Sequence, residues 1–440
     1  MHWSDFHWML PHSALSMKDW RYVGVGFFLL GVLLGTGARA QPAPDSTRWI
    51  QVRLHYQTKI ETVRLSPERG TLAVRLPSGG APVLELSPAD TVTLGRRQSD
   101  VYAQHHDARL YARTLRLTPM SEAVWSLTLP PESTRSYSGS LQLSRAEPAS
   151  AVQLVNRVPL RDYVASVVAA EYGLGDQAGS RAMAVVARTY GLFSTKKGAN
   201  GEYDHVDGTA SQVYRGLDRV TETARAATRA TRGEILTYKG QPIQAVYFSS
   251  SGGHTANNED VWTNSDPLPY LRGKEDPYDK PSPKHRWTTR INRRSLLQAL
   301  TLHQGTSVEG FLLGDRSPDG RLRTIKILRS DDTQTEIEAS TFRSIVNENV
   351  KGAPLKSTWF DARRDGSEYV FEGRGHGHGV GLNQWGAHTM AQRGKSYREI
   401  LSFYYTGVQI QHLDGTGSFP AIADDPPAEK VDSTSSRVGW

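Results

Sequence analysis

The sequence of 440 residues contains no cysteine. This absence excludes disulfide bonds, a thiol nucleophile, a cysteine-ligated metal site and an acylated N-terminal cysteine. The protein therefore depends on its hydrophobic core for stability. A hydrophobic content of 38% is normal for a globular protein, and the length is sufficient for two or three domains.

The chain also lacks blocks of lysine or arginine, although its formal net charge is +7 and its isoelectric point is near 9.4. A basic balance favours polyanionic partners, but scattered charges are mostly solvated. The pattern weakens a nucleic-acid interpretation, and it suits an anionic wall polymer or a membrane face equally well. We therefore expect no nucleic acid among the partners.

Long hydrophobic runs are absent, and the apolar run near the N-terminus, from Val23 to Leu34, is short for a membrane span. Two basic residues precede this run, and an Ala-Arg-Ala sequence ends at residue 40. These are the parts of a secretory signal peptide, which we predict over residues 1–40. Residues 1–16 do not resemble a charged n-region, so Met17 is the suspected start. An uncleaved anchor is the alternative, and in either case this segment is the expected membrane contact.

The abundance of glycine, proline, threonine, serine, valine and tyrosine favours strands and turns over long helices. Between residues 41 and 145, apolar and polar residues alternate in short runs separated by turn residues, as in Leu72-Val74-Leu76. We predict an N-terminal antiparallel β-rich region there. The fold class that follows is α+β, rich in β structure.

The pattern changes to a helical period in PLRDYVASVVAAE and again in SRAMAVVARTYGL. We expect Pro159 in the first turn of one helix and Ser180 at the N-cap of the next. Further β structure follows, including residues 321–346, within a second domain at 146–412. Residues 413–440 have no apolar period and are predicted to be a disordered tail.

Glu171 stands at the end of the first predicted helix, after an apolar face. Apolar neighbours raise the pKa of a carboxylic acid, so that it can hold a proton near neutral pH and donate it to a leaving oxygen. A glutamate at the surface end of a helix is the alternative. On this feature alone the surface interpretation is favoured.

The segment YFSSSGGHTANNEDVW, residues 247–262, raises a serine hydrolase as another alternative. It lacks the G-x-S-x-G elbow, and the members of a catalytic triad usually come from separate elements. We instead predict a glycine-rich turn that forms hydrogen bonds with a polar ligand.

The stretch GRGHGHGVGLNQWGA, residues 373–387, has glycine at every second position from Gly373 to Gly381. In a strand, the bare glycine face would admit a backbone or a flat ligand, and four side chains would share the other face: Arg374, His376, His378 and Val380.

The histidine pair in this stretch also suits a metal. Two histidines are not a complete site, so further ligands would have to come from His205, His254 or carboxylates. A phosphate loop is less favoured, because neither phosphate-binding glycine motif is present. A metal clamp and the wall of a ligand pocket both remain open on these residues.

Several motifs, taken in order over about residues 140–412, resemble the SpoIID/LytB family, which comprises sporulation stage II protein D and the amidase-enhancer proteins of bacterial cell walls. The collinear set is far more specific than any single motif. It consists of VNRVPLRDYVASVVAAE, SRAMAVVARTYGL, SQVYRG, AVYFSSSGGHTANNEDVW, FRSIV, LKSTWF, GRGHGHGVGLNQWGA and SYREILSFYYTGV.

The resemblance implies a peptidoglycan lytic transglycosylase, which cuts glycan strands and leaves a 1,6-anhydro-muramyl end. Glu171 matches the family's catalytic glutamate, which reverses the surface interpretation of that residue. A secreted location in the periplasm or at the cell wall follows. The expected substrate-binding residues, which would hold acetamido sugars, are Arg188, Ser251, His378, Gln384 and Trp385.

The family name also implies an alternative, a non-catalytic wall-binding activator of an N-acetylmuramyl-L-alanine amidase, which would be a protein partner. A metal-dependent hydrolase that uses His376 and His378 is a third possibility. Metal-bearing family members have cysteines near the QVY motif, where this chain has DHVDGTASQVY. We therefore expect no cofactor and no zinc, with His205 the remaining familiar ligand there. His378 matches the family's histidine, and His376 is the variation.

Overall fold

The computed structural model describes residues 48–131, 133–146, 151–193, 201–263, 265–352 and 354–413. The predicted signal peptide at 1–40 and, apart from Leu413, the predicted tail at 413–440 lie outside these residues. Both remain predictions. Among the described residues, no helix is long and apolar enough to cross a membrane.

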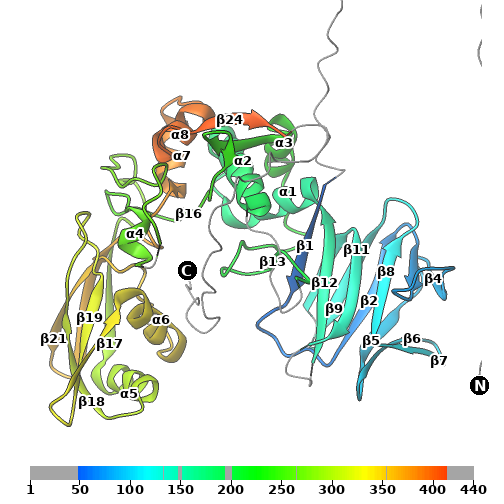
Figure 1. Cartoon of the computed structure of the whole chain (residues 1–440), viewed down its shortest axis with the longest axis horizontal. Helices are drawn as coiled ribbons and strands as arrows, with labels where there is room; N and C mark the ends of the chain where they lie inside the picture. Colours follow the sequence, from blue (N-terminus) through cyan, green and yellow to red (C-terminus); the bar gives the residue numbers. More distant parts are fainter. Residues whose placement is uncertain are drawn as a thin grey trace, which may run out of the picture. The chain divides into compact units, whose positions relative to one another are not determined.

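The N-terminal region consists of two antiparallel β-sheets, as the alternating sequence predicts (Figure 1). Every second residue of β1 (Trp49–Leu54) is buried, which is the pattern of a strand with one face on a core. The strands that follow are β2 (Thr62–Arg69), β3 (Leu72–Arg75), β4 (Leu84–Leu86), β5 (Val92–Arg97), β6 (Asp100–His105), β7 (Ala108–Ala112), β8 (Thr114–Pro119), β9 (Val124–Leu129), β10 (Ser133–Ser138), β11 (Ser140–Arg145) and β12 (Val152–Pro159).

The larger sheet has the order β13-β1-β12-β11-β8-β3-β4, and the smaller has the order β10-β9-β2-β5-β6-β7. Trp125 is fully buried in the core and stacks on Tyr137, with 5.0 Å between ring centroids. The larger sheet continues through the predicted boundary at residue 145, because β12 pairs with both β11 and β1. The following helices begin directly from this sheet.

Two helices follow, as the sequence predicts: α1 (Leu160–Glu171) and α2 (Gln177–Phe193). Pro159 is the N-cap of α1 rather than part of its first turn. The predicted N-cap at Ser180 is wrong, because α2 begins three residues earlier. Asp176 takes that role, and its carboxylate accepts a hydrogen bond of 2.6 Å from the amide of Gly179.

The remaining elements around these helices are short. They are β13 (His205–Val206), α3 (Glu222–Ala230), β14 (Glu234–Tyr238), β15 (Gln241–Pro242), β16 (Tyr247–Phe248), α4 (Asn258–Val261), β23 (Leu382–Asn383), α7 (Gln384–Gln392), α8 (Tyr397–Tyr404) and β24 (Gln409–His412). Strand β16 pairs in parallel with β23, which places the start of α7 beside β16.

Residues 286–374 have a second hydrophobic core, which the sequence did not reveal as a separate unit. It is rich in phenylalanine, and Phe342, Phe360 and Phe371 are at most 1% exposed. Its elements are β17 (Arg286–Asn292), α5 (Arg293–Gln304), β18 (Val308–Leu313), β19 (Thr324–Arg329), β20 (Gln334–Glu338), α6 (Ala339–Asn349), β21 (Phe360–Asp365) and β22 (Glu368–Arg374) (Figure 1). Most neighbouring strands of the described sheets pair antiparallel and the helices pack beside them, so the fold class is α+β.

The glycine-rich stretch is not a continuous strand. Strand β22 ends at Arg374, and the backbone angle φ is positive at Gly375, Gly377, Gly379 and Gly381. Glycine adopts this conformation without steric cost, unlike other residues. The side chains between these glycines therefore do not line one face, and the packing of the loop has to be described residue by residue.

Candidate active site

Glu171 is the last residue of α1 and is half-buried. Helix α1 buries Val167 and Val168 in the core, which draws the end of the helix against the interior. The backbone amide of Val213 donates a hydrogen bond of 2.8 Å to Oε1 of Glu171. Oε1 of Glu171 is thus held by a backbone amide, whose position is fixed by the path of the chain and not by a side-chain rotamer.

The segment that supplies this amide, SQVYRG at 211–216, is anchored at two further points. The hydroxyl of Tyr214 donates to Oδ1 of Asn156 at 2.8 Å, and the amide of Arg215 donates to Oγ of Ser166 at 3.2 Å. One anchor lies on β12 and the other on α1. The loop therefore has little freedom to move away from Glu171.

Two side chains from other parts of the chain complete the surroundings of the carboxyl group. Tyr247 on β16 and Gln384 at the start of α7 both form hydrogen bonds with Glu171. The parallel pairing of β16 with β23 brings these two residues together. Behind them, Gln212 accepts a bond of 2.8 Å from Tyr163 and donates one of 3.3 Å to Tyr247.

Burial raises the pKa of Glu171, because a charged carboxylate is poorly solvated there. The hydrogen bonds from Val213, Tyr247 and Gln384 and the charge of Arg215 act in the opposite direction, but burial dominates. The carboxyl group therefore keeps its proton to a higher pH than an exposed glutamate. Its hydrogen-bond partners in the described part of the chain are all neutral groups. The arrangement suits a group that donates a proton and then takes one back.

Comparison with known proteins identifies the family to which this chain belongs. A family model described as stage II sporulation protein matches residues 149–238, which include Glu171, and a model described as a domain of unknown function matches residues 271–381. Stage II sporulation protein D of Bacillus subtilis (strain 168) is 31% identical over 313 residues, which cover 64% of this chain and 84% of that protein. The chain belongs to the SpoIID/LytB family.

Two further relatives support this membership. Stage II sporulation protein D of Bacillus amyloliquefaciens is 31% identical over 279 residues, or 59% of this chain and 76% of that protein. The amidase enhancer of Bacillus subtilis (strain 168) is 29% identical over 281 residues, or 52% of this chain and 37% of that protein. The second core at 286–374 falls largely within the match to the domain of unknown function. This SpoIID/LytB chain thus contains two matched regions with separate cores.

Among the predicted substrate-binding residues, Gln384 lies at the site and contacts Glu171 directly. The next residue, Trp385, is half-buried, and its amide donates to the carbonyl of Ser249 at 3.2 Å. One turn further along α7, His388 pairs with Asp176 at 2.7 Å. This pair fastens α7 to the connection between α1 and α2. Trp385 remains a predicted sugar contact.

Arg188, a predicted substrate contact, lies inside the protein. Arg188 is 0% exposed within α2. Its guanidinium group donates to the backbone carbonyls of Glu234 at 3.1 Å and Thr228 at 3.3 Å. The residue joins α2 to the connection between α3 and β14, and no part of it reaches a surface where a glycan could bind.

Ser251, another predicted substrate contact, is also buried, with 0% exposure. Its amide donates to Asp279 at 2.9 Å, and its hydroxyl accepts from Gly253 at 3.2 Å. Asp279 accepts further bonds from Ser250, Gly252, His285 and Asn383. The predicted glycine-rich turn exists, but its polar groups bind this internal aspartate.

His378 is 8% exposed, and hydrogen bonds occupy both of its ring nitrogens. Nδ1 accepts from the amide of Val380 at 3.0 Å, so Nε2 carries the proton and donates to the carbonyl of Tyr247 at 3.0 Å. Burial lowers the pKa of His378 to about 3 and keeps it neutral. Its contact with a sugar stays a prediction. His378 holds the backbone of Tyr247, which contacts Glu171.

The histidines proposed as metal ligands do not converge. In the part of the chain that the structure describes, neither His376 nor His378 belongs to a group of three ligand atoms close enough to share a metal ion. Nε2 of His205 forms a hydrogen bond of 2.8 Å with the carbonyl of Gly191. The geometry therefore gives no support to a metal-dependent hydrolase at the glycine-rich loop.

The glycines of this loop serve packing against the protein itself. A Cβ on Gly381 would lie 2.1 Å from the carbonyl oxygen of Val246, and one on Gly375 would lie 2.6 Å from that of Ser250. Larger residues at these positions would push the loop away from β16. The glycines thus let another part of the backbone approach closely, which is one of the two alternatives that the sequence predicted for the bare glycine face.

Sequence reasoning did not single out four groups around Glu171: Tyr247, Gln212, the amide of Val213 and Tyr190. All four lie in motifs that carried the resemblance, so the sequence pointed to these segments but not to these individual residues. Tyr190 lies on α2, and its pKa is raised to about 12 by burial and by the charge of Glu171. Nothing in the spacing of these residues predicts that they meet.

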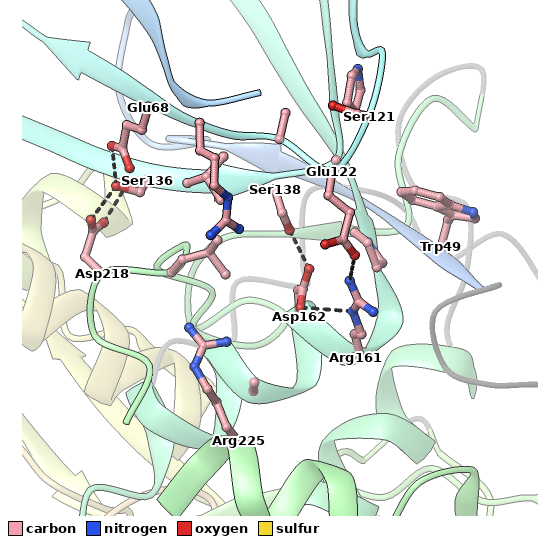
Figure 2. A pocket seen from close by; sticks show the side chains of 18 of the residues that line it. Trp49, Glu68, Ser121, Glu122, Ser136, Ser138, Arg161, Asp162, Asp218 and Arg225 are labelled. Atoms are coloured by element: carbon pink, nitrogen blue, oxygen red, sulfur yellow. Dashed lines mark hydrogen bonds and ion pairs between the residues drawn. The ribbon is translucent and has the colours of Figure 1, made fainter. Parts of the chain in front are cut away.

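A cavity of about 940 Å³ lies elsewhere in the described residues and does not include Glu171 (Figure 2). It lies between the β strands and the helices α1 and α3. Its acidic groups are engaged within the protein: Asp162 accepts from Ser138 at 2.7 Å, and Glu122 pairs with Arg161 at 3.1 Å. The acidic groups of this cavity are thus held by contacts within the protein, and Glu171 lies apart from them.

Proposed function

We propose that this protein is a peptidoglycan lytic transglycosylase in which Glu171 is the catalytic acid and base. The observation that carries the proposal is the half-buried Glu171 carboxyl group, whose pKa is raised by burial and whose hydrogen-bond partners are neutral. This residue falls within the segment matched by the stage II sporulation protein model. The coarser function, work on the bacterial cell wall, agrees with the same relatives.

The reaction needs a single carboxyl group. Protonated Glu171 donates its proton to the glycosidic oxygen as the bond from that oxygen to C1 breaks. The C6 hydroxyl of the same muramyl sugar forms a bond to C1 and releases its proton to the Glu171 carboxylate. The product is a 1,6-anhydro end, and the enzyme returns to its protonated state. Hydrolytic glycosidases use two carboxyl groups because one must activate water or attack the sugar.

The neutral partners of Glu171 have a defined part in this cycle. Hydrogen bonds from Val213, Tyr247 and Gln384 stabilise the carboxylate that exists between the two proton transfers. They also limit the rotation of the carboxyl group. Burial opposes them and favours the protonated form, so the two proton states are closer in free energy than for an exposed glutamate.

The direct test is digestion of peptide-stripped glycan strands, followed by mass spectrometry for anhydromuramyl products. The wild type is expected to release them, and Glu171→Gln is expected to lose at least 100-fold in rate, in the range that a general acid contributes. Glu348→Gln is the matched control, since Glu348 is an exposed glutamate near the end of another helix, α6. Absence of anhydro product from the wild type would remove the transglycosylase proposal.

The similarity to an amidase enhancer favours a second candidate, a wall-binding activator of an amidase. An activator would need a glycan-binding surface but no proton transfer at Glu171. We would measure the rate of a purified N-acetylmuramyl-L-alanine amidase on intact wall with and without each protein. Equal stimulation by the wild type and by Glu171→Gln, without anhydro products, would favour the activator.

We also propose that the protein acts outside the cytoplasmic membrane, with glycan strands as its partner and no cofactor at Glu171. The location rests on the signal-like sequence ending at residue 40. N-terminal sequencing of the mature protein from fractionated cells tests it. A first residue of Gln41 in the extracytoplasmic fraction is expected, and an uncleaved chain in the cytoplasm would contradict it.

A further inference from the structure

A group of three potential metal ligands lies on the N-terminal β region, apart from the proposed active site. Asp90 lies between β4 and β5, and His105 and His106 lie at the end of the β6–β7 hairpin. One ligand atom from each residue lies within 4.8 Å of the other two. In the described ranges this is the only group of three histidine, cysteine or acidic residues that meets this condition. Neither the family comparison nor the proposed function assigns it a role.

The carboxylate of Asp90 is already oriented toward the histidines. Its Oδ2 accepts hydrogen bonds from both the amide and the hydroxyl of Ser87, each at 2.7 Å. Its Oδ1 lies 3.0 Å from Nε2 of His105. Outer groups that fix a carboxylate in this way are typical of metal sites, where they orient the ligand before the metal binds.

The charge of Asp90 also suits a cation. Aspartate side chains are ordinarily ionised at neutral pH and supply a negatively charged oxygen ligand. The ring centroids of His105 and His106 lie 4.2 Å apart with the rings edge to face. Two imidazoles and one carboxylate thus gather at one point on the surface.

The backbone at His106 shapes the turn that carries this side chain. His106 has a φ of 51°, in the left-handed region that only a few per cent of residues other than glycine occupy. His105 pairs with Ala108 across the hairpin, so the loop that joins the two strands has two residues. Glycine would fit this position with less strain. Histidine is among the residues that adopt this conformation most readily after glycine, so the turn can hold a ligand-type side chain at its tip.

We propose that Asp90, His105 and His106 form a binding site for a divalent transition metal of the zinc class. Imidazole nitrogen together with a carboxylate oxygen suits Zn²⁺, Cu²⁺ or Ni²⁺, whereas Ca²⁺ and Mg²⁺ prefer sites made of oxygen ligands alone. In a tetrahedral Zn²⁺ site the ligand atoms are about 3.3 Å apart, as bond lengths near 2.0 Å require. The separation of 3.0 Å between Asp90 and His105 is close to that value. His106 is exposed and can rotate toward them.

A metal at this point would connect two segments that the contact between Asp90 and His105 already brings together. The connection between β4 and β5 carries one ligand, and the tip of the β6–β7 hairpin carries the other two. Strands β5, β6 and β7 form one edge of the smaller sheet. Binding would therefore stabilise this edge, since a ligand that binds only the folded state raises its stability.

The test uses the untagged full-length protein after treatment with a chelator. Calorimetric titration with Zn²⁺ and elemental analysis are expected to give one zinc per chain with a Kd in the micromolar range or tighter, and a higher Tm with zinc. Co²⁺ is expected to give the visible absorption of a four-coordinate site. His303→Ala is the control, because His303 is an exposed histidine on α5.

The decisive variant is His106→Gly. It removes one ligand and also suits the backbone angle of 51°. We expect the metal-free protein to be at least as stable as the wild type, while the affinity for Zn²⁺ falls at least 10-fold. Asp90→Ala should lower the affinity by a similar factor. The proposal is overturned if the wild type takes up no stoichiometric zinc, or if His106→Gly binds zinc as tightly as the wild type. Neither result would affect the proposal for Glu171.

Discussion

The hydroxyl of Tyr247 donates a hydrogen bond to the carboxyl group of Glu171. The two residues lie on different elements, β16 and the end of α1, and the bond forms because β16 is held beside β23 and by the imidazole of His378. Gln212 also donates a hydrogen bond to this hydroxyl, at 3.3 Å. His378 in the glycine-rich loop thus affects the Glu171 carboxyl group indirectly, because it holds the backbone of Tyr247 in place.

Replacement of Glu171 by glutamine is expected to stabilise the protein at high pH. The pKa of Glu171 is raised in the folded state, so its contribution to stability is fully present below the unfolded pKa and is lost as pH rises through the folded pKa. Glutamine has no charge to bury. Thermal unfolding at pH 5 and pH 8 should therefore give a gain in Tm for the variant that is larger at pH 8.

The same measurement on Glu348→Gln is the control, since Glu348 is exposed. A Tm difference between Glu171→Gln and the wild type that does not change with pH would contradict the raised pKa. It would leave the transglycosylase assay as a separate question.

Removal of the Tyr247 hydroxyl is expected to shift the pH profile of glycan cleavage. The bond from Tyr247 stabilises the charged carboxylate and lowers the pKa of Glu171. In Tyr247→Phe the pKa should rise further, so the fall in activity at high pH should move to higher pH, while the maximal rate falls because the intermediate carboxylate is less stable. The rate measured from pH 4 to pH 9 tests both effects.

Tyr405→Phe is a matched control for this variant. Tyr405 is also fully buried, and its hydroxyl donates to the carbonyl of Val246 at 2.8 Å, on the segment that leads into β16. Both variants should lose about 1 kcal/mol of stability, as expected for one hydrogen bond. Only Tyr247→Phe should shift the pH profile, and a shift in both would mean that the effect arises from general loosening of the site.

Arg188→Ala is expected to destabilise the fold by about 3 kcal/mol, because it leaves the buried carbonyls of Thr228 and Glu234 without a donor. Chemical unfolding measures this loss directly. Arg181→Ala, on the same helix but partly exposed, should change the stability by less than about 0.5 kcal/mol. If Arg188→Ala were as stable as the wild type but lost glycan binding, the structural role would be wrong.

Acidification is expected to weaken the fold partly through His378. Its pKa is about 3 when folded and near 6.5 when unfolded, so its contribution is present above pH 6.5 and is lost as pH falls toward 3. Between pH 7 and pH 5 this amounts to about 2 kcal/mol, from 1.36 kcal/mol per pH unit below 6.5. His376, with a pKa lowered to about 4, acts in the same direction.

In His378→Gln the slope of unfolding free energy against pH should decrease, although the variant is less stable at pH 7. His303→Gln, which removes an exposed histidine, should leave the slope unchanged. An unchanged slope in His378→Gln would show that His378 is not held neutral by burial.

The sequence by itself determined the local structure and the principal candidate. Alternation of apolar residues predicted the N-terminal strands, and the apolar period before Glu171 predicted α1, because both depend on which neighbours along the chain face the core. The ordered motifs predicted the family and singled out Glu171. Periodicity reports burial, so it also suggested that this carboxyl group has a raised pKa.

Only the tertiary structure decided what surrounds Glu171. The pairing of β16 with β23 brings Tyr247 and Gln384 to it, and a loop anchored on Asn156 brings the amide of Val213. No local sequence pattern predicts these contacts with Glu171, because they form between segments that are distant in the sequence. For the same reason motif membership alone could not separate residues that reach the carboxyl group from Arg188, Ser251 and His378, which are buried and bonded within the protein that supports it.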